Sequence, residues 1–241
     1  MAGSRRPAPN DADLPGAERG GGLAAYRERI GREKRGAILD AAVELFIEAG
    51  YDGATLEQVA RRADVSTGTL FKYFPTKAAL FGAIMARVWE VDAQVEQVDQ
   101  PGASVTAPKG PRPALPLLLQ SIGLDYARLL RAPHVEGLFR VVIAEVMRFP
   151  ELGRELYERG KKPYLDRLHA VLEREAADGR AVIPDIPLAA RQFLGMINDL
   201  IFWPRFLVSD LAVTEDDVDR VVAAATATFL ARYAAQPPGA S

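Results

Sequence analysis

The spacing of apolar residues constrains this chain more than any other feature of its sequence. From about Leu23 onward, apolar side chains recur at steps of three and four residues, and the first long run contains Ile38, Leu39, Ala42, Leu45, Phe46 and Ala49. This spacing is the period of an α-helix with one buried face, and no stretch shows the sustained alternation of a half-buried strand. The sequence therefore predicts an all-α fold.

Proline and glycine divide this pattern into separate helices. Gly50 stands where a left-handed C-terminal cap would end the first helix near Ala49. Pro163 lies inside a long helical run and is expected to kink it or split it. Four prolines make residues 98–113 a loop. In the second half of the chain, helices are predicted over residues 114–131, 134–147, 151–177, 188–206 and 215–233.

Composition narrows the classes of function. The 241 residues include no cysteine, which excludes thiolate nucleophiles, disulfides and cysteine-ligated metals and fits a reducing, cytoplasmic location. The two histidines, His134 and His169, lack metal-ligand spacing, so neither a metal nor another cofactor is expected. No uncharged apolar stretch reaches the roughly 18–20 residues that span a bilayer, so no membrane partner is expected either. A nucleophile elbow, a phosphate-cradling glycine loop and a paired acid–base motif are all missing, which argues against an enzyme.

The most informative stretch follows the first helix. Thr55 and Gln58 have the spacing of a capping box at the start of a two-turn helix. A short turn at Asp64 comes next, Ser66 is a candidate N-cap for a third helix, and Pro75 must stop that helix. Two short helices joined by a tight turn form the helix-turn-helix, whose second helix lies in the major groove of DNA.

The third helix divides by face. Leu70 and Phe74 lie one turn apart and are expected to pack inward. Gly68 would let the N-terminus of the helix approach a base pair or a phosphate closely. An ordinary surface helix is the alternative, but small hydroxyls beside Lys and Tyr suit base edges and phosphates. The outward face should carry Thr67, Thr69, Lys72 and Tyr73.

Two motifs in this stretch match a known family: Thr55-Leu-Glu-Gln-Val-Ala and Ala63-Asp-Val-Ser-Thr-Gly-Thr-Leu-Phe-Lys-Tyr-Phe-Pro-Thr-Lys77. They resemble the DNA-binding domain of the TetR family of bacterial transcriptional regulators, and the resemblance covers about residues 38–80. It implies an all-α homodimer. It also implies an N-terminal three-helix helix-turn-helix domain and a C-terminal helical domain for ligand binding and dimerisation.

The expected domains follow from this resemblance and from composition. Residues 1–22 hold three prolines and five glycines with almost no large apolar side chain, so they are expected to form a disordered arm. Residues 23–77 form the DNA-binding domain, residues 78–235 the helical effector-binding and dimerisation domain, and residues 236–241 a flexible tail.

Carried onto this sequence, the family's DNA contacts fall on Thr55, Thr67, Gly68, Thr69, Lys72, Tyr73 and Lys77. We add Ser66 at the N-cap and Arg35, the basic residue nearest the folded domain, although the basic residues before it could equally form a solvated face. For Arg61 and Arg62 the solvated face is favoured. Asp64 stands where the family usually has Gly, and it tolerates left-handed geometry.

Two further departures from the family concern the third helix. Phe71 replaces a frequent Tyr and cannot donate to a phosphate. Thr67 replaces a frequent Lys or Arg, which removes one charged contact and points to a different preferred DNA sequence.

The second half of the chain is less diagnostic. Arg148-Phe-Pro-Glu-Leu-Gly153, Ala190-Arg-Gln-Phe-Leu-Gly195 and Phe202-Trp203 are similar to the AefR-like subgroup of this family. Aromatic, soft or polar residues on otherwise apolar helices are typical of small-molecule sites, although each of them could be simple core. The candidates for an effector site are Tyr126, His134, Phe139, Met147, Phe149, Asn198, Phe202 and Trp203.

The last two predicted helices, over residues 188–206 and 215–233, are candidates for the dimer interface. The first is apolar most of the way round, with Phe193 and Ile197 in one stripe and Leu194 in another. The second has a stripe of valines and Phe229 flanked by small alanines that permit close helix approach. A four-helix bundle with two helices from each subunit would bury both, and an intramolecular core is the alternative.

The sequence thus predicts a ligand-responsive repressor that binds a palindromic operator in double-stranded DNA and releases it when a small apolar molecule binds. An activator of the same fold is the first alternative, and an enzyme or a scaffold built on the helical body is the second. The net charge of −2 is no objection to DNA binding, because the basic charge is concentrated. Residues 23–35 hold five basic residues against two acidic ones, and residues 61–77 hold four against one.

Overall fold

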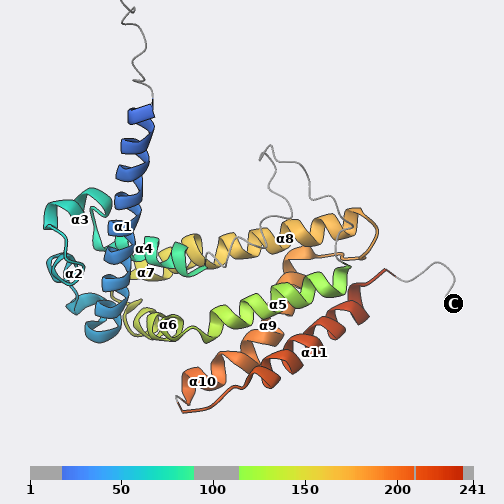
Figure 1. Cartoon of the computed structure of the whole chain (residues 1–241). Helices are drawn as coiled ribbons and strands as arrows, with labels where there is room; N and C mark the ends of the chain where they lie inside the picture. Colours follow the sequence, from blue (N-terminus) through green and yellow to red (C-terminus); the bar gives the residue numbers. More distant parts are fainter. Residues whose placement is uncertain (1–17, 90–113, 209, 236–241) are drawn as a thin grey trace, which may run out of the picture.

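The computed structural model describes residues 18–89, 114–208 and 210–235. In these ranges helices are joined by short turns (Figure 1), with one isolated bridge between Ala181 and Ala234 and no strand. The all-α prediction is confirmed. The elements are α1 (Glu18–Gly53), α2 (Leu56–Arg62), α3 (Thr67–Tyr73), α4 (Lys77–Trp89), α5 (Leu115–Arg131), α6 (Pro133–Glu145), α7 (Pro150–Glu155), the π-helical segment η2 (Leu156–Lys161), α8 (Lys162–Ala177), α9 (Ile186–Ile201), α10 (Trp203–Leu207) and α11 (Glu215–Tyr233).

Two hydrophobic cores hold the helices together. The first surrounds Phe46 and Phe81 and joins α1, α2, α3 and α4 to the buried faces of α6 and α7. The second lies between α5, α8, α9 and α11, where the rings of Phe193 and Phe229 meet at 5.8 Å between centroids. Figure 1 shows α1, α2 and α3 grouped at one end, with the helical body extending away from them.

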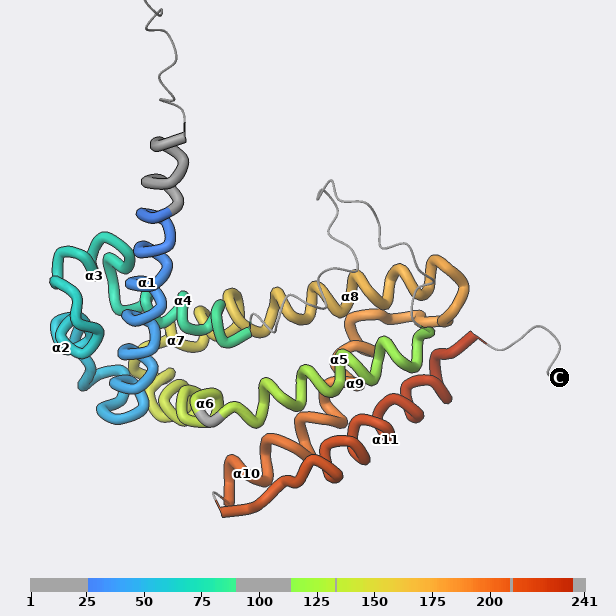
Figure 2. Tube along the Cα trace, in the orientation of Figure 1, coloured from blue at the N-terminus to red at the C-terminus, as the bar shows by residue number. Residues whose placement is uncertain are grey.

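Helices α4 and α6 belong to both cores. Phe81 of α4 is buried in the first core, and Trp89 at the other end of the same helix is buried in the second. On α6, Leu138 is buried in the first core and Val135 in the second. Both helices reach α1 in Figure 2. The position of α1, α2 and α3 relative to the body is therefore set mainly through these two helices.

The N-terminal end of α1 differs from the prediction. The helix begins at Glu18, so residues 18–22, which the sequence places in a disordered arm, are helical. Lengthening an existing helix by one residue costs far less than nucleating a new one, and the amphipathic helix beyond Leu23 supplies the nucleus. The rest of the predicted arm (residues 1–17), the predicted loop (98–113) and the predicted tail (236–241) lie outside the described residues.

The predicted break after Ala49 is confirmed, with a difference in detail. Gly50 has a positive φ of 75°, but its ψ of 172° is extended and does not belong to the left-handed helical region. This combination of angles is essentially restricted to glycine. The backbone then forms one more helical turn and ends at Gly53.

The effect predicted for Pro163 is also confirmed. The long run over residues 151–177 is divided into α7, η2 and α8, and the π-helical segment η2 ends two residues before the proline. Proline lacks an N–H and its ring clashes with the carbonyl four residues earlier in a regular α-helix. A widened π turn at this point relieves that clash, which gives η2 a local cause in the sequence.

No helix in the described ranges is long and apolar enough to cross a membrane. The same ranges contain no group of three or more His, Asp or Glu side chains arranged to hold a metal ion.

Candidate nucleic-acid interface

Helix α2 begins at the predicted capping box. The Thr55 hydroxyl accepts a hydrogen bond from the Gln58 N–H at 3.2 Å, and the Gln58 side chain accepts one from the Thr55 N–H at 2.8 Å. Val59 and Ala60 are fully buried against α1 and α3. The Thr55 hydroxyl is therefore engaged in capping, while its side chain remains exposed beside the turn.

A tight turn connects α2 to α3. Asp64 adopts φ 53°, the left-handed geometry expected of the residue that stands in place of the family's glycine. The Val65 N–H then bonds to the Ala60 carbonyl at 3.0 Å, which closes the turn. The predicted turn is confirmed, with aspartate tolerated at the left-handed position.

Helix α3 is held at both ends and on its inner face. The Ser66 hydroxyl accepts the Thr69 N–H at 3.1 Å and lies 2.8 Å from the Thr69 hydroxyl. Leu70 is fully buried and Phe74 nearly so, as the spacing predicts. Because the inner face and the cap are both fixed, the orientation of the outer face relative to α1 and α2 is well defined.

The outer face of α3 is open to solvent. Ser66, Thr67, Gly68 and Lys72 are all exposed, and no heavy atom lies within 4 Å of the position that a Gly68 Cβ would occupy. Phe71 is 42% exposed on the same short helix. Phe71 is not among the predicted DNA contacts, because its ring cannot donate to a phosphate. An exposed aromatic ring on such a helix suits the methyl group of thymine, and its exposure is the signal that was missed.

Two of the predicted contacts on α3 are less accessible. Tyr73 is half-buried, its ring centroid lies 6.4 Å from that of Phe74, and its hydroxyl approaches Gly31 of α1. Thr69 is half-buried and bonded to the cap. Tyr73 and Thr69 therefore help to hold α3 in place, and both also lie near its outer face.

The basic face of α1 lies next to α3. The Arg35 guanidinium lies 5.6 Å from the centroid of the Phe74 ring, and its side chain is exposed. This contact brings a positive charge of α1 to the end of α3. In contrast, Arg62 forms an ion pair with Glu48 at 2.7 Å, which agrees with the solvated-face interpretation favoured for it.

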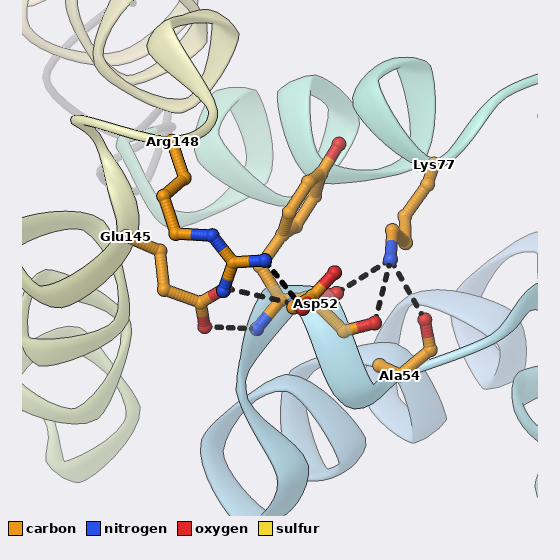
Figure 3. A network of polar contacts seen from close by, with 6 residues as sticks. Asp52, Ala54, Lys77, Glu145 and Arg148 are labelled. Atoms are coloured by element: carbon orange, nitrogen blue, oxygen red, sulfur yellow. Dashed lines mark hydrogen bonds and ion pairs between the residues drawn. The ribbon is translucent and has the colours of Figure 1, made fainter.

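Lys77, the first residue of α4, binds backbone carbonyls at the end of α1 and in the turn that follows. Its ammonium donates to the carbonyl oxygens of Tyr51 (2.6 Å), Asp52 (3.3 Å) and Ala54 (2.9 Å), as Figure 3 shows. It also lies 4.6 Å from the centroid of the Tyr51 ring. An ammonium has three N–H donors, and here all three are used within the protein. This geometry gives Lys77 a structural role, and its contact with DNA stays a prediction.

The structure brings Phe139, Phe202 and Trp203 together but leaves other predicted effector residues apart. Tyr126 is buried beside Tyr164 in the core of the body, and His134 lies at the start of α6. Met147 is 90% exposed, and Phe149 packs on Tyr51 in the first core. The others lie at α6, α9 and the start of α10, where Phe139, Trp203 and Phe206 surround the ring of Phe202 and Asn198 is half-buried.

This dispersion has a physical reason. Periodicity shows which side of a helix is apolar, but it does not show which helices meet. A recess of about 440 Å³ lies between the end of α5, α10 and the start of α11, and none of the eight predicted effector residues lines it. Its lining includes Arg128, Arg131 and Arg205.

Buried tyrosines distinguish the core of the body. Burial raises the pKa of Tyr126 to about 12 and, with the nearby Tyr126 and Asp125, also raises that of Tyr164. The Tyr164 hydroxyl has a long contact of 3.4 Å to the Ile122 carbonyl. The Thr226 hydroxyl is buried and has no hydrogen-bond partner among the described residues. The core of the body therefore holds neutral hydroxyl groups, of which that of Thr226 is unpaired and that of Tyr164 has one long hydrogen bond.

Comparisons with known proteins agree with this geometry. Residues 38–84 match the model of bacterial regulatory proteins of the tetR family, and residues 118–235 match the model of the C-terminal domain of AefR-like transcriptional repressors. Together the two matched segments contain α2, α3, α6 and α11 completely.

Individual relatives are similar over part or most of their length. The HTH-type transcriptional repressor KstR of Rhodococcus jostii is 31% identical over 141 residues, which are 58% of this chain and 59% of that protein. Among solved structures, the flavonoid-responsive regulator FrrA is 25% identical with a TM-score of 0.63, covering 85% of this chain and 98% of that one. A TetR-family structure from Mesorhizobium loti, 24% identical with a TM-score of 0.64 and the same coverages, shows the same fold.

Proposed function

The chain belongs to the TetR family of bacterial transcriptional regulators, and from this premise we propose that it is a homodimeric repressor that releases a palindromic operator when a small apolar molecule binds its helical body. The observation that carries the proposal is the outer face of α3. A rigidly capped helix leaves Thr67, Gly68, Phe71 and Lys72 open to solvent in the position of a recognition helix.

The distribution of charge supports a phosphate backbone as the partner of this face. Arg27, Arg32 and Lys34 are exposed on α1, and Arg35 lies at the end of α3. Phosphate contacts position a protein on DNA, whereas contacts to base edges specify the sequence. We assign Arg35 and Lys72 to the first role and Thr67 and Phe71 to the second.

The core of the body supports the effector part of the proposal. Its buried Tyr126 and Tyr164 lie in apolar surroundings, the Tyr164 hydroxyl has only a long hydrogen bond, and the buried Thr226 hydroxyl has no partner among the described residues. Leaving a buried polar group unpaired is costly, and a ligand that pairs with it recovers that cost. FrrA, by its name, responds to flavonoids. For this chain we propose a ligand of that general character, with the tyrosines as its partners.

The dimer part of the proposal rests on the faces of α9 and α11 that are exposed in a single chain. Phe193, Leu194, Ile197 and Phe229 are buried within one chain, so the apolar stripes that the sequence assigned to the interface serve mainly the intramolecular core. The outer faces carry Leu188, Gly195 and Leu200 on α9 and Ala223, Ala224, Ala227, Thr228 and Ala231 on α11. Small side chains allow two helix pairs to approach closely and form a four-helix interface.

The proposal is tested by binding to the intergenic DNA upstream of the protein's own gene. Fluorescence anisotropy on a labelled duplex of this DNA should show binding by the wild type, with an affinity that falls steeply as salt is raised. The double variant Thr67→Ala, Lys72→Ala should bind at least about tenfold more weakly, because it loses one base contact and one phosphate contact. It should also show a shallower dependence on salt.

The matched control is Lys161→Ala, which removes one exposed positive charge from η2, away from α3. We expect it to bind like the wild type, and circular dichroism should show equal helix content in all three proteins. Equal binding by the double variant and the wild type, or binding that does not depend on salt, would contradict the proposal.

A further inference from the structure

The joint at the end of α1 contains a backbone position that only glycine can fill. Gly50 has φ 75° and ψ 172°. A Cβ atom built there would lie 2.6 Å from Oε1 of Glu145, a residue at the end of α6. The side chain missing from Gly50 therefore makes room for a carboxylate that comes from the body of the protein.

The Glu145 carboxylate bonds to the backbone directly after this glycine. Its Oε1 accepts the Tyr51 N–H at 2.6 Å, and its Oε2 accepts the Asp52 N–H at 2.8 Å (Figure 3). The α1 helix is interrupted at Gly50, and the two N–H groups begin its last turn. A half-buried, charged acceptor makes strong hydrogen bonds to such donors.

The same turn is held from its other side by Lys77. The Glu145 carboxylate accepts hydrogen bonds from the N–H groups of Tyr51 and Asp52. The Lys77 ammonium donates hydrogen bonds to the carbonyl oxygens of Tyr51, Asp52 and Ala54. One short turn thus lies between a carboxylate of α6 and an ammonium of α4. It leads directly into Thr55, the cap of α2.

The Tyr51 side chain fills the space between these elements. Its ring contacts the rings of Phe46, Phe81 and Phe149 at centroid distances of 5.2–5.8 Å. Burial and the nearby carboxylates of Glu151, Glu155 and Glu145 raise the pKa of Tyr51 to about 12. The turn is consequently a rigid joint, because its backbone groups are hydrogen-bonded to Glu145 and Lys77 and the Tyr51 ring is packed among other aromatic rings.

Helix α6 connects this joint to the far side of the body. Five residues before Glu145 on the same helix, Arg140 donates to the Phe206 carbonyl of α10 at 2.6 Å, and its guanidinium lies 4.6 Å from the centroid of the Phe206 ring. Glu136 lies 3.8 Å from Arg205 of the same helix. A displacement of α6 would therefore move the carboxylate that holds the joint.

Building on the function proposed above, we infer that Glu145 is the positioning residue through which the body sets the placement of the recognition helix. The carboxylate fixes the turn 50–54 to α6, and the turn fixes the starts of α2 and α4. In a dimer this placement decides the distance between the two recognition helices. Glu145 touches no DNA in this account and acts through the backbone of Tyr51 and Asp52.

The test is the variant Glu145→Gln, compared on two DNA duplexes. The Gln amide has the same shape as the Glu carboxylate. Its NH₂ group is a donor and cannot accept a hydrogen bond from a backbone N–H, so one of the two hydrogen bonds to Tyr51 and Asp52 is lost. The duplexes are the full palindrome that the wild type protects in the intergenic DNA upstream of its gene, and one half of that palindrome. Anisotropy gives both affinities at the same low salt concentration.

We expect Glu145→Gln to weaken binding to the full palindrome by about tenfold, within the 5- to 150-fold range of typical coupling between sites. Binding to the single half-site should stay within about twofold of the wild type, because one recognition helix needs no fixed partner distance. A recognition-helix variant such as Lys72→Ala should weaken both. Equal losses on the two duplexes, or no loss on either, would overturn the inference.

The matched control at the same joint is Arg148→Ala. Arg148 pairs with Asp52 at 3.0 Å, but both side chains are more than half exposed, and such surface pairs contribute little. We expect it to bind both duplexes like the wild type. A loss on the full palindrome equal to that of Glu145→Gln would show that any change at the joint has this effect and would contradict a specific role of Glu145.

A measurement on the free protein separates this inference from the proposed function. Hydrogen exchange followed by NMR should show the amides of Tyr51 and Asp52 protected in the wild type and exchanging at least about tenfold faster in Glu145→Gln. Unchanged exchange would overturn the contact, whatever the protein binds. If the exchange changes as expected but the wild type binds no upstream DNA, then the proposed function fails and the role in positioning a recognition helix fails with it, while the joint itself stands.

Discussion

At the scale of single residues, the DNA-facing region depends on side chains that cap its helices, form the turn between them and fill the core beneath them. Thr55 and Ser66 cap α2 and α3, and Asp64 takes the left-handed position between them. Each of these roles depends on neighbours within four residues, so each is visible in the sequence. Lys77 is the exception among the predicted contacts, because the carbonyls that bind it lie more than 20 residues earlier.

His134 gives a prediction that belongs to this scale. Burial lowers its pKa, the positive charge of Arg87 lowers it further, and Asp40 opposes both. A histidine whose pKa is lower in the folded state than the ordinary value of about 6.5 contributes stability above that value. This contribution is lost as the pH falls from 6.5 through the folded pKa, because the unfolded chain then binds a proton that the folded protein resists.

We therefore expect the melting temperature to fall less between pH 7.5 and pH 5.5 in His134→Gln than in the wild type. Differential scanning calorimetry at the two pH values measures this difference. Identical falls in the two proteins would show that His134 does not couple to unfolding. The prediction concerns stability alone and does not depend on what the protein binds.

At the scale of elements, helix α4, which leaves the DNA-facing region, packs against η2. Trp89 of α4 is buried, and its indole packs against Gly160 of η2 and lies 6.0 Å from the Tyr164 ring. The π-helical turn, which Pro163 favours, places this glycine opposite the indole. The sequence shows the proline and the glycine, but only the packing of α4 on η2 explains why a side chain is excluded there.

Gly160→Ala should therefore destabilise the protein. The new Cβ would lie 2.5 Å from Cδ1 and 2.6 Å from Nε1 of Trp89, and a buried indole cannot move without displacing α4. Overpacking of this kind costs about 1–3 kcal/mol, so we expect the melting temperature to fall by several degrees.

The control for this change is Gly36→Ala in the interior of α1, where no heavy atom lies within 4 Å of the added Cβ. Alanine at such a helix position should raise stability by about 0.5–1 kcal/mol. Thermal unfolding of both variants under the same conditions separates the clash of the added Cβ with Trp89 from the general preference of a helix for alanine over glycine. If the two substitutions shift the melting temperature in the same direction, the packing of Gly160 on Trp89 does not limit stability.

At the scale of the whole molecule, the two hydrophobic cores share α4 and α6, and the outer faces of α9 and α11 remain uncovered in one chain. The proposed dimer covers these faces. A charge placed among the small residues of α11 would then be buried at the interface at a cost that no partner offsets.

We expect Ala227→Glu to convert the dimer to a monomer, and Ala170→Glu, on the exposed face of α8, to leave it unchanged. Size-exclusion chromatography with light scattering measures the mass of each variant at one concentration. A dimeric Ala227→Glu protein, or a monomeric wild type, would contradict the proposed interface. Both alanines are exposed in a single chain, so neither change should prevent folding.

The sequence by itself determined the all-α class, most of the helices and the helix-turn-helix. Helix period, capping boxes and the breaks at Gly50 and Pro163 depend on residues within a few positions of one another, and these short-range interactions are legible in the chain. The inward position of Leu70 and the left-handed turn at Asp64 follow in the same way.

Only the tertiary structure decided the joint and the fate of the predicted effector residues. Glu145 meets Tyr51 across 94 positions of the chain, and nothing in either local sequence points to the other. Side-chain type likewise made Met147 and Phe202 candidates for the same effector site, yet one is exposed and the other buried, since their surroundings depend on which helices pack together. Contacts between distant segments arise from the shape of the whole fold, and local patterns carry no record of that shape.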